Sequence, residues 1–250
     1  MNYRMTVQYD GTRYEGWQRQ TRTAETIQGR LEAAVRAVTG ETVQVIGAGR
    51  TDAGVHAAGQ TANFHLAAPR EVRALETALN EALPDDIGIS GLAEADERFH
   101  SRFSAAAKTY RYRIRTGTEK KVFERRFVWQ YGKPLDTAAM KRAAALLTGM
   151  HDFTSFCGNK KMKKTAVRTI SSIELHEKDG ELAIDYTGDG FLQNMVRILT
   201  GTLVEVGEGK RTAEDMPRIL EARDRQAAGF TAPAQGLILL RVFYDGEQTL

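Results

Sequence analysis

Val43 to Leu66 reads VQVIGAGRTDAGVHAAGQTANFHL. Val43 and Val45 begin a strand pattern that runs into a glycine-rich segment, Gly47 to Gly54, and another strand pattern follows from about Gly59 to Leu66. Glycines permit tight backbone paths and the close approach of other groups. The stretch therefore predicts two strands joined by a compact, polar loop.

Helical patterns lie on both sides of this stretch. Apolar residues repeat at helical spacing from Ile27 to a stop at Gly40. A second helical pattern of apolar residues runs as far as Leu83, and Pro69 suits the first turn of that helix. Strand patterns over Tyr3–Tyr9 and from Ile87 to about Ala93 complete the set. The order strand, helix, strand, strand, helix, strand predicts a ferredoxin-like arrangement, or split βαβ.

The second half repeats this order with longer loops. The expected elements are a strand over Lys108–Arg115, a helix from Asp136, a hairpin of Val167–Leu175 and Leu182–Tyr186, helices over Phe191–Val206 and Ala213–Ala222, and a closing strand over Leu237–Tyr244. We therefore expect an α+β protein of two ferredoxin-like (βαββαβ) lobes, an N-terminal lobe over residues 1–104 and a C-terminal lobe over residues 105–250. No linker rich in Pro, Gly or Ser separates them, so the lobes are expected to pack together.

Composition narrows the class of protein. The chain has 250 residues, 42% of them apolar, and no apolar run long enough to cross a bilayer or to form a signal peptide. A cytoplasmic location without membrane contact is expected. Cys157 is the one cysteine, which excludes an internal disulfide and a multi-cysteine zinc site. The histidines lack the spacing of metal ligands, so no metal site is expected.

Positive charge is concentrated in two stretches of the second half. One runs from Lys108 to Arg126, and the other carries Lys160, Lys161, Lys163 and Lys164 without any acid nearby. Localised positive charge suits a polyanion such as a nucleic-acid backbone. A solvated face or a mobile basic loop would show the same composition, and the residues alone leave both interpretations open.

The glycine-rich loop is the strongest candidate for chemistry. Arg50 and Asp52 stand two residues apart in it, and an arginine at that distance would keep an aspartate ionised for nucleophilic or base catalysis. A dinucleotide-binding fingerprint would need glycine at position 52, and the ending of a phosphate-binding P-loop is missing. A plain turn with a salt bridge stays open. Asp10-Gly11-Thr12 favours a turn that ends the first strand.

Several segments resemble the tRNA pseudouridine synthase A family. Gly49-Arg50-Thr51-Asp52-Ala53-Gly54-Val55-His56-Ala57 is similar to the active-site motif of that family. Similar motifs follow in family order along nearly the whole chain: Tyr9–Gln18, Phe99–Ala105, Lys108–Tyr112, Gly149–Phe156, Gly190–Arg197 and Gly236–Leu239. The tail after Tyr244 is short for the family.

The resemblance implies a pseudouridine synthase fold with a central, mainly antiparallel sheet and a cleft between the lobes. It implies a homodimer, no cofactor, and isomerisation of uridine to pseudouridine in the anticodon stem-loop of tRNA, around positions 38 to 40. Alternative hypotheses are an RNA-binding module without catalysis and a synthase that modifies another RNA, such as ribosomal RNA.

The resemblance also assigns roles to residues. Asp52 is the implied nucleophile, Arg197 its ion-pair partner and Tyr110 the active-site tyrosine. Residues implied in substrate binding are Arg50, Leu237, Arg102, Lys160, Lys161, Lys163 and Lys164. Attack of the carboxylate on C1′ of the ribose, addition to C6 of the base and removal of the 2′-proton all remain possible routes.

Overall fold

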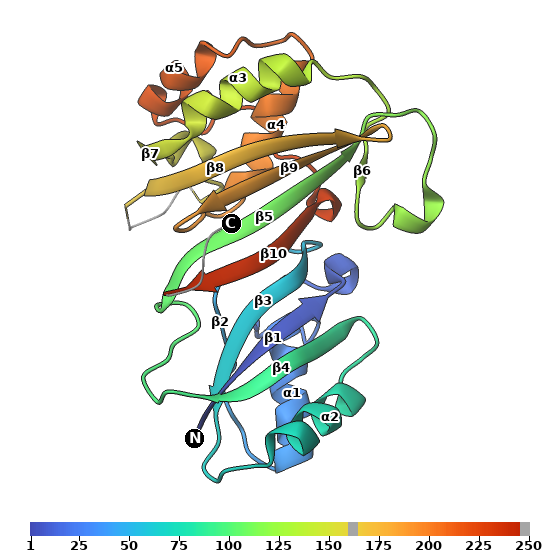
Figure 1. Ribbon diagram of the computed structural model, residues 1–250, viewed down its shortest axis with the longest axis vertical. Helices are drawn as coiled ribbons and strands as arrows, with labels where there is room; N and C mark the ends of the chain where they lie inside the picture. The colour runs from blue at the N-terminus through green and yellow to red at the C-terminus, as the bar shows by residue number, and fades with distance from the viewer. Residues whose placement is uncertain (160–164, 246–250) are drawn as a thin grey trace. The chain divides into compact units, whose positions relative to one another are not determined.

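The computed structural model describes residues 1–159 and 165–245 (Figure 1). The chain forms two compact units: Met1–Ala106 together with the closing segment from Leu239, and Ala107–Ile238. Each unit combines helices with a mainly antiparallel sheet, as expected for an α+β protein. No helix in the described parts of the chain is both long and apolar enough to cross a bilayer.

The first unit contains the predicted order of elements. Its strands are β1 (Asn2–Tyr9), β2 (Ile46–Gly47), β3 (His56–His65), β4 (Ile87–Ala95) and the part of β10 (Leu237–Tyr244) that begins at Leu239. The strands lie in the order β4-β1-β3-β10, and β2 pairs with β3. β1 is antiparallel to both neighbours, with Tyr3 opposite Phe64 on one side and Glu94 on the other. Its central position makes β1 the core strand of this unit.

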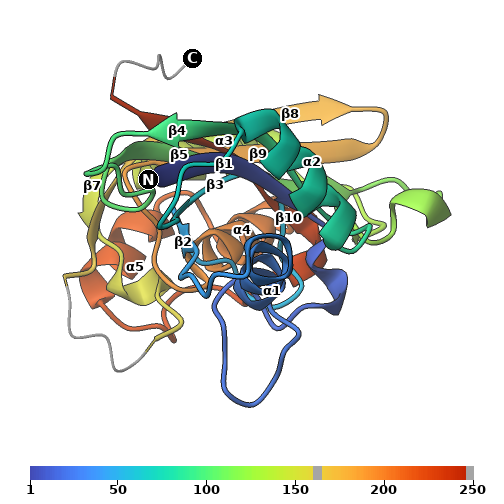
Figure 2. The same cartoon turned by 90° about the horizontal axis from the view of Figure 1, so that it is seen from below.

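Two helices complete the first unit. Helix α1 (Ile27–Thr39) begins where the Thr26 hydroxyl accepts from the Gly29 amide, and it ends at the left-handed Gly40. Its predicted apolar stripe is buried as far as Val35, and Figure 2 shows α1 on one side of β1 and β3. Helix α2 (Val72–Ala82) contacts α1 and β4.

Two predicted boundaries in this unit are wrong. Pro69 lies before helix α2 and not in its first turn, because the Glu71 carboxylate accepts from the Arg73 and Ala74 amides and makes Glu71 the N-cap. The strand expected from Val43 is only the two residues of β2. The Val45 amide donates to Oε1 of Glu32 on helix α1, 3.2 Å away, so this segment bonds to the helix before it reaches the sheet.

The second unit has the predicted helices and hairpin, together with two short strands. Its strands are β5 (Ala105–Arg115), β6 (Trp129–Gln130), β7 (Gly149–Asp152), β8 (Val167–Lys178) and β9 (Glu181–Gly188), and its helices are α3 (Thr137–Leu147), α4 (Met195–Gly207) and α5 (Asp215–Ala222). The strands lie in the order β5-β9-β8-β7, and the short β6 runs parallel to β5. β6 and β7 were not predicted, since two to four residues give too little alternation to recognise.

Local sequence explains several boundaries of this unit. Asp136 caps α3 by accepting from the Ala139 amide, and the residues Met140, Ala143, Ala144 and Leu147 on one face of this helix are buried. Asp179 and Gly180 have positive φ, which suits the tight turn between β8 and β9. Helix α4 was expected from Phe191 but begins at Met195, because the left-handed Asn194 (φ 59°) interrupts helical geometry just before it.

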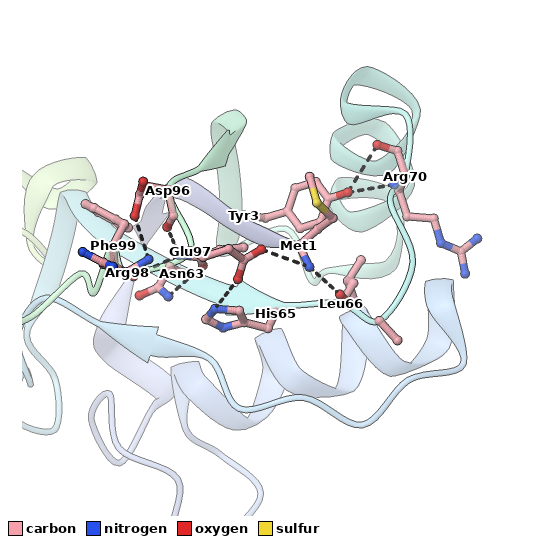
Figure 3. A network of polar contacts seen from close by, with 12 residues as sticks. Met1, Tyr3, Asn63, His65, Leu66, Arg70, Asp96, Glu97, Arg98 and Phe99 are labelled. Carbon is pink, nitrogen blue, oxygen red and sulfur yellow. Dashed lines mark hydrogen bonds and ion pairs between the residues drawn. The ribbon is translucent and has the colours of Figure 1, made fainter.

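A buried polar network ties the edge of the first unit together. The Asn63 side chain accepts from the amide and hydroxyl of Ser101, at 2.9 and 2.8 Å, and donates to Asn2. The Asn2 side chain in turn donates to the carbonyls of Asp96 and Phe99. Figure 3 shows Asn63, Asp96 and Phe99 together with the polar contacts of Met1 and Tyr3. Buried polar groups that are fully paired fix one arrangement of the chain.

We expect Asn63→Ala to lower the free energy of unfolding by about 2 kcal/mol, because it leaves the buried Ser101 amide and hydroxyl and the Asn2 side chain without their partner. Urea unfolding followed by circular dichroism measures the change. Gln44→Ala is the control, since Gln44 is exposed and lies outside the helices and strands. Equal stability of the two variants would contradict a structural role for this network.

Candidate active site

Asp52 lies in the loop between β2 and β3, within the segment that the sequence singled out. The loop leaves the sheet at Ala48, whose amide donates to the Thr61 carbonyl at 2.8 Å. The Gln60 side chain brackets the next residue, donating to the Gly49 carbonyl at 2.8 Å and accepting from its amide at 3.3 Å. Thr51 is buried and Asp52 is half-buried. The loop therefore has a defined path before it reaches the aspartate.

The connection between β1 and α1 holds the loop on both sides of Asp52. The Trp17 amide donates to the Thr51 carbonyl at 3.0 Å, just before the aspartate. The Gly54 amide donates to the Tyr14 carbonyl at 3.3 Å, just after it. These two bonds fix the backbone that carries the carboxylate. We call this arrangement the loop clamp.

The clamp depends on the absence of a side chain at Gly16. This residue has φ +92°, and a Cβ atom there would lie 2.7 Å from the Thr51 carbonyl oxygen. Real Cβ atoms essentially never approach backbone so closely. Glycine at this position therefore allows the connection to touch the backbone of the Asp52 loop.

Tyr9, the last residue of β1, adds a side-chain contact to the clamp. Its hydroxyl and that of Thr51 form a hydrogen bond of 2.9 Å in the interior. Burial raises the pKa of the Tyr9 phenol well above its ordinary value. The phenol therefore stays neutral and keeps its hydrogen-bonding proton at all ordinary pH values.

His56 links the end of β1 to the start of β3. Its Nδ1 accepts from the Gly11 amide at 3.0 Å and lies 3.2 Å from Oδ1 of Asp10. Asp10 caps a short 3₁₀ turn, Gly11–Arg13, so the predicted strand-ending turn is confirmed.

Arg50 shares the loop with Asp52 and is exposed to solvent. The ion pair between these two side chains, expected from their spacing, stays a prediction. Arg102 also lies in the first unit, on the loop that follows Phe99. His100 Nδ1 accepts from the Arg102 and Phe103 amides, at 3.2 and 3.3 Å, and this turn leaves the Arg102 side chain exposed.

Tyr110 lies in the middle of β5 in the second unit. It is directly opposite Tyr186 on β9, and its side chain is buried. Its ring meets the ring of Phe191 edge to face, with centroids 5.2 Å apart. The predicted alternation of β5 is confirmed, because Tyr112 and Ile114 are buried as well.

Arg197 lies in the first turn of α4, and its guanidinium is oriented by two acceptors. Nε donates to the Ala232 carbonyl at 2.7 Å, and a terminal nitrogen donates to Oδ1 of Asn194 at 3.1 Å. Burial raises the pKa of Tyr112, and the positive charge of Arg197 opposes that increase. Tyr112 is on the same face of β5 as Tyr110, so the second unit brings Arg197 and Tyr110 to one face of this strand.

Asn194 is a further candidate site residue, and the sequence analysis gave it no role of its own. It combines a left-handed backbone with a side chain that orients Arg197 three residues later. The spacing between them is visible in the sequence, whereas the left-handed conformation is not. Leu237 begins β10 and is buried, and its expected contact with the uracil stays a prediction.

Part of the predicted basic surface is neutralised inside the second unit. Arg111 donates twice to the Asp185 carboxylate, at 2.7 Å each, and Arg113 pairs with Glu181 and Glu124. Arg115 is buried and donates to the Asp179 carbonyl. Strand register places Arg111 directly opposite Asp185, whereas Arg113 lies opposite Ala183 and reaches Glu181 diagonally. These contacts stabilise the β5–β9 pair and engage part of the positive charge of this stretch.

The other basic stretch cannot be described in the same way. Lys160, Lys161, Lys163 and Lys164 lie outside the described residues. Over the residues that the structure does describe, no group of three or more His, Cys, Asp or Glu side chains is arranged to hold a metal ion.

Comparison with known proteins places the chain in a family. A family model described as tRNA pseudouridine synthase matches residues 5–104 and 143–245. The chain is 45% identical to tRNA pseudouridine synthase A of Acetivibrio thermocellus over 243 residues, covering 97% of this chain and 99% of that protein. It is 46% identical to the protein of that name from Geobacillus sp. (strain WCH70), over 96% of this chain and 97% of that protein. It is also 46% identical to the protein of that name from Brevibacillus brevis, over 96% of this chain and 98% of that protein. The chain belongs to the tRNA pseudouridine synthase family.

Proposed function

We propose that this protein isomerises uridine to pseudouridine in tRNA and that Asp52 is its nucleophile. The observation that carries the proposal is the loop clamp. Hydrogen bonds on either side of Asp52 fix the backbone of a half-buried carboxylate within the segment that the family model matches. A catalytic group that is held in place before the substrate arrives lowers the entropic cost of reaction.

The reaction needs a carboxylate but no net oxidant or energy source. The N1–C1′ bond of the nucleoside breaks, a C5–C1′ bond forms, C5 loses its hydrogen as a proton, and N1 gains a proton. The Asp52 carboxylate has three possible first steps: attack on C1′, addition to C6, or removal of the 2′-proton. Each requires the ionised form of the side chain.

Arg197 and Tyr110 are proposed to complete the site. The guanidinium of Arg197 is oriented by Ala232 and Asn194, which suits an ion-pair partner that keeps Asp52 ionised. Tyr110, a buried aromatic residue of β5, is proposed to stack on a base that is turned out of its helix. Proposed substrate contacts are Arg50, Leu237, Arg102, Lys160, Lys161, Lys163 and Lys164.

We further propose that the target uridines lie in the anticodon stem-loop, around positions 38 to 40, and that the protein acts as a cytoplasmic homodimer without a cofactor. The family motifs and the relatives named tRNA pseudouridine synthase A support a tRNA substrate. Replacing the uridines at positions 38 to 40 by cytidines in a tRNA transcript tests the position of the target directly. The transcript with cytidines at these positions should not react.

Release of tritium from tRNA labelled at C5 of uridine measures the proposed reaction. We expect the parent protein to release tritium and Asp52→Asn to slow release by at least about 10³-fold at matched tRNA binding, because an amide cannot replace an ionised nucleophile. Asp85→Asn is the matched control, since Asp85 is an exposed aspartate of the same unit. It should retain the parent rate.

Three results would each contradict this proposal. Equal release by the parent and Asp52→Asn would mean that another residue carries the chemistry. A parent protein that binds tRNA but releases no tritium would favour an RNA-binding module. Release from a ribosomal RNA hairpin in preference to the anticodon stem-loop would assign a different substrate.

Arg197→Lys tests the role of the oriented guanidinium. The lysine keeps the charge but cannot donate to both Ala232 and Asn194 in the planar geometry of arginine, so we expect turnover to fall by about 10²-fold with less than threefold weaker tRNA binding. Arg218→Lys, on the exposed side of α5, is the control. Unchanged turnover of Arg197→Lys would remove Arg197 from the mechanism.

A further inference from the structure

We propose that the loop of residues Thr118–Phe127 is a second tRNA contact, in which Phe123 stacks on an unpaired base and the surrounding cations hold the adjacent phosphates. We call it the aromatic–basic loop. The inference rests on the proposed function, because it takes tRNA as the polyanion that the protein meets. In Figures 1 and 2 this stretch, between β5 and β6, extends away from the sheet of the second unit.

The loop presents apolar side chains to solvent. Phe123, in the short helical turn Val122–Glu124, is 97% exposed, and Val122 beside it is 57% exposed. Burying a phenylalanine side chain stabilises a folded protein, and Phe123 does not gain that stabilisation in the free protein. An aromatic ring held in full contact with water is a candidate for stacking on a ligand.

Both ends of the loop are attached to the second unit. At one end, buried Arg115 donates to the Asp179 carbonyl and lies 3.4 Å from the Glu119 carboxylate. At the other end, Val128 is buried, and Trp129 packs against the rings of Tyr112, Tyr131 and Phe230. Between these ends, the Phe127 amide donates to the Glu124 carbonyl at 2.8 Å and closes the turn.

The charges of the loop favour an anionic partner. Lys120, Arg125 and Arg126 are exposed around Phe123. The Glu124 carboxylate accepts a hydrogen bond from Arg113, which lowers its pKa, and lies 3.8 Å from Lys121. The other acid of the loop, Glu119, faces Arg115. Arginines at the base of the loop thus engage both carboxylates, and Lys120 and Arg125 are exposed cations near the ring.

Single-stranded nucleic acid matches this combination of groups. Aromatic side chains stack on bases of any sequence while cations follow the backbone. A second copy of the chain is a poorer match, because the three exposed apolar residues of the loop, Val122, Phe123 and Phe127, supply far less than the roughly 800 Å² per partner of a standard interface. The loop begins beyond Arg115, five residues along β5 from Tyr110, which is roughly 16 Å in an extended strand. It would therefore contact a nucleotide other than the target uridine.

Binding of full-length protein to a tRNA transcript tests the proposal. We expect Phe123→Ala to raise both Kd and KM by at least about fivefold, with a smaller change in kcat, because one base–aromatic stack is lost. Phe123→Trp should keep parental affinity and add a fluorescence signal that tRNA quenches, above that of Trp17 and Trp129. Met150→Ala is the control, since Met150 is an exposed apolar residue of the same unit, and its Kd should not change.

The cations are tested through the dependence of binding on salt. Replacing both Lys120 and Arg125 by glutamine should lower the slope of log Kd against log salt by about 1.5. Parental Kd and salt slope in both sets of variants would overturn the proposal. So would parental Kd for Phe123→Ala together with a shift from dimer to monomer in sedimentation, which would assign the loop to a second copy. Failure of the proposed function is seen separately, as absence of tritium release by the parent protein.

Discussion

The hydrogen bond from the Trp17 amide to the Thr51 carbonyl is the contact on which the proposed site depends. It joins two segments that are distant in sequence, the connection after β1 and the loop before β3, and it acts one residue away from Asp52. The other contacts of the clamp act on the same short piece of backbone, through the Gly54 amide and the Thr51 hydroxyl. A carboxylate on a loop can be placed accurately when the backbone on each side of it is fixed in this way.

Much of the fold could be predicted from periodicity alone. The alternation of β1 and β5, the buried stripe of α3 and the turn at Asp179–Gly180 depend on residues close together in sequence, so a local pattern shows them. Predictions were wrong where a side-chain contact or a backbone conformation that periodicity does not show decided the outcome. The Glu32 carboxylate takes the Val45 amide and delays β2, and left-handed Asn194 postpones the start of α4.

In the candidate site, too, features that lie close together in sequence could be predicted, whereas contacts between distant segments could not. The sequence singled out the loop of Asp52 by its glycines and charges, but it could not show that Gly16 and Trp17 hold that loop, because the contact is between segments. Charge was harder to interpret than geometry. Arg111 and Arg113 were grouped with the exposed cations that follow them, yet strand register pairs them with carboxylates of β9. A basic stretch therefore combines residues that stabilise a sheet with others that face solvent.

The central claim is that the clamp positions Asp52 for catalysis, and two glycine variants test it most directly. Gly16 and Gly91 both have positive φ, +92° and +62°, so alanine costs a similar backbone strain at either position. A Cβ at Gly16 would lie 2.7 Å from the Thr51 carbonyl oxygen, whereas one at Gly91 would meet no atom within 4 Å. In the tritium-release assay, with both variants shown to be folded, the account predicts that Gly16→Ala lowers kcat by about 10²-fold and that Gly91→Ala stays within about twofold of the parent. Equal rates for the two variants would contradict it.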